Sequence, residues 1–171
     1  RAWTDTVDTS IDVALACGSR TVVLSTGRSS ELAVQRVLKL AEESFVMMGD
    51  HFGYSLQSCA RKGVPEVVVA GQFAKLVKIA CGHEQTHVSS SELDLVTVAS
   101  WLKEDPATAH LAKLAREANT ARHLLEESGF DKALIKLVCG KVAEACAELA
   151  PFLKVRVFLA GYQGEALHFD R

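Results

Sequence analysis

The chain has 171 residues, 49% of which are hydrophobic, and a formal net charge of −2. This length and composition suit one domain with a full hydrophobic core. Lys and Arg form no basic run, and no apolar run approaches the roughly 20 residues that cross a bilayer. We therefore expect neither a nucleic-acid-binding surface nor a membrane anchor.

The chain contains five cysteines, an odd number without a Cys-x-x-Cys pair. We expect them to be reduced, small apolar residues rather than metal ligands, which favours the cytoplasm. The sequence does not begin with Met and opens within a helical pattern. We expect a single α/β domain over 1–171 that forms the carboxyl-terminal portion of a longer protein. Homo-oligomerisation stays open.

Four short apolar runs end in glycine and predict the strands of a sheet. The runs are 22–27, 45–49, 67–71 and 155–161. Gly27, Gly49 and Gly71 end the first three runs at intervals of 22 residues, and a stretch with helical periodicity follows each of them. This rhythm is typical of a β-α-β-α-β-α unit with a parallel sheet.

The elements alternate up to about residue 81, after which the pattern becomes helical. Strands are expected at 21–26, 45–48, 66–70 and 153–160, and helices at 4–17, 29–40, 51–62, 73–81, 91–104, 107–118, 120–128 and 131–149. The predicted fold class is α/β: a three-layer α/β/α domain with a four-stranded, mainly parallel sheet and a helical block before the last strand.

The turn at 25–30, Ser-Thr-Gly-Arg-Ser-Ser, places hydroxyl groups and a glycine at a helix N-terminus. Free backbone N–H groups there can hold a phosphate or a carboxylate. The alternative is that Ser29 or Ser30 only caps the helix. Because open α/β sheets bind ligands at the carboxyl ends of their strands, Thr26 and Gly27 are candidate ligand-binding residues.

Gly49-Asp50-His51 follows the second strand. A carboxylate at this place can accept hydrogen bonds from two ribose hydroxyls, as in dinucleotide and adenosyl sites. The alternative is that Asp50 caps the next helix. The two roles are compatible, since a cap can lie beside a ligand.

Gly71 ends the third strand, and Lys75 falls in the first turn of the next helix. A positive side chain there opposes the helix dipole. It also reaches toward the carboxyl edge of the sheet, where it can pair with an anionic ligand. The alternative is a solvated lysine.

The segment 83–87, His-Glu-Gln-Thr-His, contains the zinc-peptidase pattern H-E-x-x-H. Gly82 directly before it is expected to end the helix that such ligands need, which argues against zinc. Thr86 and His87 can instead bind a polar ligand or move a proton. Ser91 is expected to cap the helix that follows.

Several segments resemble the cobalt-precorrin-5B C1-methyltransferases of the anaerobic cobalamin pathway. The matching segments are 22–29, 45–56, 75–82, Thr86-His87 with Ser91 and Asp94-Leu95, and 118–121. The resemblance covers nearly the whole chain and the carboxyl-terminal part of the longer family members. Only the Thr86-His87 half of 83–87 belongs to the family pattern.

The resemblance implies methyl transfer from S-adenosylmethionine to carbon 1 of a corrinoid, with cobalt only within the substrate. Such a transfer needs alignment of donor and acceptor more than it needs an acid or a base. The residues expected to bind the donor are Thr26, Gly27, Gly49, Asp50 and Gly71; those expected to bind the substrate are Arg28, Lys75 and Thr86; the expected catalytic residue is His87. The expected partners are the corrinoid and the amino-terminal part of the same protein.

Three alternatives stay open. The turn at 25–30 resembles the serine-rich phosphate loop of phosphosugar-binding modules of the sugar-isomerase type, although this leaves Asp50 and His87 unexplained. A zinc hydrolase built on 83–87 is a second alternative. A non-catalytic corrinoid carrier is a third, if another part of the protein supplies the donor site.

Overall fold

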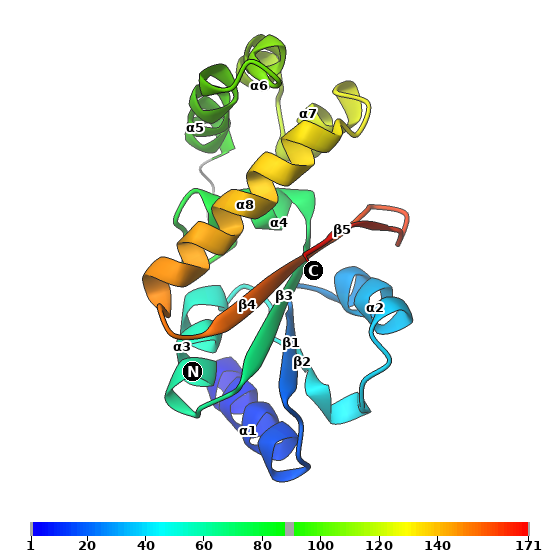
Figure 1. Ribbon diagram of the computed structural model, residues 1–171, viewed down its shortest axis with the longest axis vertical. Coiled ribbons are helices and arrows are strands. Elements are labelled where there is room, and N and C mark those ends of the chain that lie inside the picture. The colour runs from blue at the N-terminus through cyan, green and yellow to red at the C-terminus, as the bar shows by residue number, and fades with distance from the viewer. Residues whose placement is uncertain (1, 88–90, 171) are drawn as a thin grey trace.

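The computed structural model describes residues 2–87 and 91–170, in which five strands form one mixed sheet in the order β2-β1-β3-β4-β5 (Figure 1). The strands are β1 (Thr21–Ser25), β2 (Phe45–Met47), β3 (Glu66–Gln72), β4 (Lys154–Ala160) and β5 (Ala166–Phe169). The first four run parallel, and β5 is antiparallel to β4. The predicted parallel sheet is confirmed for the four expected strands.

Helices cover both faces of the sheet, which confirms the expected three layers. The helices are α1 (Ala2–Ala16), α2 (Arg28–Val37), α3 (Phe52–Arg61), α4 (Phe73–Ala80), α5 (Ser91–Glu104), α6 (Ala112–Glu117), α7 (Ala121–Glu127) and α8 (Lys132–Leu149), with the 3₁₀ turns η1 (Glu42–Ser44) and η2 (Ala109–Leu111). Figure 1 shows α2 on one side of the sheet and α1, α3, α4 and α8 on the other. None of the helices in the described ranges is long and apolar enough to cross a membrane.

The strands are apolar on both faces because both faces are covered. Val22 and Leu24 of β1 point into the large core beneath α1, α3, α4 and α8. Val23, between them, points to the opposite face and packs with Ala33 and Val34 of α2. Because successive side chains of a strand point to opposite faces, one short apolar run contributes residues to both cores.

The helical block α5 to α8 lies between β3 and β4 in the chain, as predicted. The helix expected at 107–118 is divided, because η2 precedes the short α6. Asp131 caps α8: its Oδ1 accepts hydrogen bonds from the backbone N–H groups of Ala133 and Leu134 at 2.9 and 3.0 Å. The helix expected at 29–40 ends earlier, because Leu38 is already extended.

The expected count of four strands is wrong, because β5 adds a fifth at the edge. The chain turns back at Gly161, whose N–H donates to the carbonyl of Glu165 at 2.7 Å. Phe169 of β5 then packs edge-on against Phe158 of β4, with ring centroids 5.7 Å apart. A four-residue strand whose residues are all partly or fully exposed lacks the continuous apolar run that predicted the others.

The aromatic pair tests whether β5 is docked in solution. We expect Phe158→Leu and Phe169→Leu to be coupled by about 0.5–1.5 kcal/mol in a double-mutant cycle, because aromatic pairs contribute this much beyond burial. Urea unfolding of the wild type, both single variants and the double variant measures the coupling. Additive losses would contradict the docking of β5.

Candidate functional site

Three predicted site segments meet at the carboxyl edge of the sheet. Ser25 at the end of β1 pairs with Met47 of β2 and Ala70 of β3. Beyond it, the N–H of Met48 donates to the carbonyl of Ser25 at 2.9 Å, and the N–H of Thr26 donates to the carbonyl of Ala70 at 3.0 Å. These bonds fix the turns after β1, β2 and β3 beside one another.

Asp50, Lys75 and Thr86 form one hydrogen-bonded cluster at this edge. The Asp50 Oδ1 atom accepts hydrogen bonds from Lys75 Nζ at 2.9 Å and from Thr86 Oγ1 at 2.8 Å. The backbone N–H of Thr86 donates to the Asp50 carbonyl at 3.0 Å, and Lys75 Nζ also donates to the Thr86 carbonyl at 3.2 Å. Three of the predicted site residues, far apart in sequence, are therefore in direct contact.

The cluster keeps Asp50 ionised. Burial raises the pKa of its carboxyl group, but the hydrogen bonds from Lys75 and Thr86, together with the charges of Lys75 and His87, outweigh burial and hold the pKa below its ordinary value. At neutral pH Asp50 is thus an acceptor of hydrogen bonds and cannot act as an acid. Its side chain is 39% exposed, so a ligand can reach it.

A hollow of about 230 Å³ opens beside Asp50. It is lined by Trp3, Gly49, Asp50, His51, Gln85 and His87. His87 is exposed at this place. The structure thus places the expected catalytic residue and two of the expected donor-binding residues around one space.

Trp3 is the residue of this hollow that the sequence did not single out. Its indole Nε1 donates a hydrogen bond to the Met48 carbonyl at 3.0 Å. Gly49 lies directly under the ring: its φ is +59°, and a Cβ there would be 2.9 Å from Trp3 Cζ2. Gly49 is therefore needed both for its backbone conformation and for the approach of the indole.

The N-cap position of α3 is occupied by His51, not Asp50. The alternative role of Asp50 as a helix cap is thus wrong, because its side chain is held by Lys75 and Thr86 instead. The His51 ring has its own partner, since Gln85 Nε2 lies 3.1 Å from His51 Nδ1. This contact ties the segment after α4 to the start of α3.

In the turn at 25–30, the Arg28 and Ser30 side chains bind neighbouring residues of the same segment. Gly27 is the N-cap residue of α2, and Ser30 Oγ donates to its carbonyl at 2.9 Å. The Arg28 side chain is paired with Glu31 at 2.6 Å, and among the described residues it makes no contact with the cluster. Ser25 Oγ is buried and has no hydrogen-bond partner in the described part of the chain.

Gly71 and Thr26 lie side by side. A Cβ on Gly71 would be 3.1 Å from Thr26 Oγ1, so glycine leaves room for the buried threonine. The serine-rich phosphate-loop interpretation gains no support, because Ser30 is engaged within its own turn.

The residues of the H-E-x-x-H pattern do not converge. Helix α4 ends at Ala80, before the pattern begins. His83 Nε2 lies 2.9 Å from Asp94 Oδ1, and the Glu84 side chain fills the space above Gly53. No group of three metal-binding side chains is found among the described residues. The geometry gives the zinc-hydrolase alternative no support. The side chain of Ser91, the expected cap of α5, lies outside the described residues.

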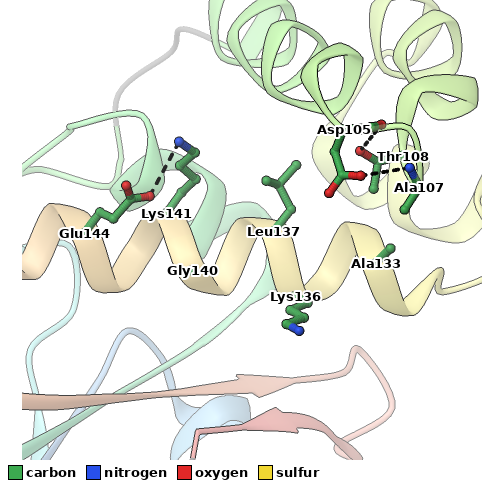
Figure 2. Close-up of a pocket in the computed structure, with 9 residues that line it drawn as sticks. All are labelled: Asp105, Ala107, Thr108, Ala133, Lys136, Leu137, Gly140, Lys141 and Glu144. Atoms are coloured by element: carbon green, nitrogen blue, oxygen red, sulfur yellow. Dashed lines mark hydrogen bonds and ion pairs between the residues drawn. The ribbon is translucent and has the colours of Figure 1, made fainter.

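Another hollow, of about 610 Å³, lies between α8 and the segment that joins α5 to η2 (Figure 2). Figure 2 shows Lys141 on the side of α8 that faces Asp105, whereas Lys136 points away from it. Lys141 is itself paired with Glu144 at 3.5 Å. The hollow is lined by as many acidic as basic side chains, and none of the predicted site residues lines it.

Comparison with known proteins supplies the family. The model of the C-terminal domain of CbiD matches residues 85–170. The chain belongs to the CbiD family. A protein of Geobacter sp. (strain M21) is 72% identical over 170 residues, and one of Citrifermentans bemidjiense is 71% identical over 169 residues. Both bear the name cobalt-precorrin-5B C(1)-methyltransferase.

The CbiD-family chain spans about half the length of these curated relatives: the alignments cover 99% of this chain and 48% of each relative. A relative from Geobacter sulfurreducens is 62% identical with the same coverage. No solved structure matches the chain. The match to the C-terminal domain includes Thr86 and His87 and begins after Asp50 and Lys75.

We expect Asp50→Asn to lower the free energy of unfolding at pH 7 by less than about 1 kcal/mol, because the Asp50–Lys75 pair is partly exposed. The pKa of Asp50 is lower in the folded state, so its contribution is complete above the ordinary value near 3.9 and is lost as the pH falls through the folded value.

Urea unfolding of wild type and Asp50→Asn at pH 7 and pH 3 measures this dependence. The gap between the two proteins should shrink at pH 3. Glu117→Gln, which removes an exposed carboxylate paired with Lys113, is the control and should change stability by less than about 0.5 kcal/mol. A gap that grows toward low pH would contradict the assigned direction of the pKa.

Proposed function

We propose that this chain is the carboxyl-terminal part of a cobalt-precorrin-5B C1-methyltransferase and that its sheet edge binds the methyl donor, S-adenosylmethionine. The observation that carries the donor site is the Asp50 cluster. An ionised, partly exposed carboxylate follows the second strand of a parallel sheet, at the edge where such sheets bind ligands. The names of the relatives support the reaction.

The residues present fit the donor. Lys75 and Thr86 both bind Asp50 Oδ1, and within the described residues Oδ2 accepts no hydrogen bond. The Oδ2 atom of the ionised Asp50 can therefore accept hydrogen bonds from the two hydroxyls of a ribose. The N-terminus of α2 follows β1 at the same edge of the sheet, and its free backbone N–H groups suit the carboxylate end of the donor.

When bound, S-adenosylmethionine supplies an electrophilic methyl group on a sulfonium sulfur. The protein's part is then to hold and orient both reactants. Under this proposal Lys75 positions Asp50, since two of its donor directions are already used by Asp50 and Thr86. His87, exposed at the hollow, is placed to meet the acceptor.

Calorimetric titration of S-adenosylhomocysteine into the chain tests the donor site. We expect binding that Asp50→Asn weakens by about tenfold or more, because a hydrogen bond to a charged group contributes about 1.5–3 kcal/mol. Glu66→Gln is a matched control. Glu66 is also an ionised, paired carboxylate, bound by Lys154 and Arg156, but it lies at the opposite end of β3.

The control should bind S-adenosylhomocysteine like the wild type. If the chain does not bind this ligand, or if both variants weaken it equally, the donor site proposed here is wrong.

For the complete enzyme we expect His87→Ala to slow methyl transfer by about 100-fold or more if His87 moves a proton. Because the side chain is exposed, the melting temperature should barely change. His110→Ala, an exposed histidine on η2, is the control and should retain activity. A large loss of stability with unchanged turnover would assign His87 a structural role instead.

A further inference from the structure

Trp3 has a fixed indole ring that is partly exposed. Its indole is anchored by the hydrogen bond to the Met48 carbonyl at 3.0 Å and lies so close to Gly49 that a Cβ there would be 2.9 Å from Trp3 Cζ2. Yet 47% of the residue remains exposed. The indole therefore has surface that a ligand can contact.

The exposed ring belongs to the hollow beside Asp50. The His51 ring lies next to it, with centroids 6.4 Å apart and planes tilted by 36°. Gln85 is held against His51 at 3.1 Å and lines the same space. The hollow therefore joins an aromatic surface, an amide and an ionised carboxylate.

These groups match the parts of a nucleoside. A flat purine stacks on an aromatic face, and base–aromatic stacking is tolerant of the base's hydrogen-bonding pattern. The hydroxyls of a ribose suit the carboxylate of Asp50. The hollow measures about 230 Å³, below the roughly 300–1,000 Å³ of pockets that enclose drug-sized molecules, and this size suits a nucleoside-sized group.

We propose that Trp3 is the platform on which the purine ring of an adenosyl ligand stacks, while Asp50 binds its ribose. This inference rests on the proposed function and assigns the hollow to the nucleoside half of the donor. Trp3 is a binding residue in this assignment. Gly49 serves it by letting the indole lie close to the backbone.

Tryptophan fluorescence tests the assignment directly, because the chain has two tryptophans. The second, Trp101, lies on α5 with Lys141 Nζ 5.1 Å from its ring, and it is not part of this hollow. In a Trp101→Phe variant all indole emission comes from Trp3. We expect adenosine and S-adenosylhomocysteine to change this emission saturably, and methionine to leave it unchanged.

The matched variant Trp3→Phe keeps Trp101 as the only reporter and should show no such change. By calorimetry, Trp3→Ala should weaken S-adenosylhomocysteine about fivefold to 100-fold, and Trp3→Phe less, because it keeps an aromatic face. Val13→Ala, at an equally exposed position of α1, should leave the affinity unchanged.

The outcomes separate this inference from the proposed function. If S-adenosylhomocysteine binds and Asp50→Asn weakens it, but Trp3 emission and the Trp3→Ala affinity do not change, the platform is wrong and the donor site stands. If methionine alone changes the Trp3 emission, the hollow holds the other half of the donor and the inference is overturned. If S-adenosylhomocysteine does not bind at all, both proposals fail.

Discussion

The parallel pairing of β1 with β2 and β3 is the constraint on which the site depends. Because Ser25 pairs with both Met47 and Ala70, β1 and β2 end at the same level of the sheet, and β3 ends two residues later, at Gln72. Asp50 then follows β2, and Lys75 lies in the first turn of α4, directly after β3. A shift of one residue in either pairing would turn the strand's side chains to the opposite faces and separate the turns that now meet.

The Asp50 cluster resolves a conflict between burial and charge. Burial favours the neutral acid, and two hydrogen bonds with the nearby charge of Lys75 reverse that preference. Both hydrogen bonds fall on Oδ1. The contacts that keep the carboxylate ionised thus occupy one oxygen, and the other remains for a ligand. Lys75 can reach Asp50 Oδ1 because α4 begins directly at the sheet edge.

Much of this arrangement could be predicted from sequence, because the glycine-ended apolar runs report buried parallel strands. The cluster of Asp50, Lys75 and Thr86 was foreseen only as separate candidates. Their mutual contacts depend on the path of the segment after α4, which carries no periodic signal. Arg28, expected to bind the substrate, pairs with Glu31 one helical turn later, and its expected role stays a prediction. That pairing follows the helical spacing of three residues and could have been predicted.

Trp3 and β5 escaped prediction for a different physical reason. The role of Trp3 depends on a contact between the first turn of α1 and the turn after β2, and no local pattern encodes such a contact. The trace that this contact leaves in the sequence is the glycine at position 49, where any side chain would clash with the indole. For β5, the strand pairs at an exposed edge, so its sequence need not be apolar on both faces as β1 and β3 are.

The proposed place of the nucleoside has a consequence for the proposed reaction. If the hollow beside Asp50 holds the nucleoside half of the donor, the methyl group and a corrinoid acceptor meet outside this hollow. The exposed side chain of His87 lines this hollow. Alignment is the main requirement of methyl transfer. The Asp50–Lys75 pair, the hydrogen bond from the Trp3 indole and the backbone hydrogen bonds between the strands each hold a group in place at this edge. Under the proposal, a donor bound there has fixed partners, and the acceptor is the reactant that remains to be aligned.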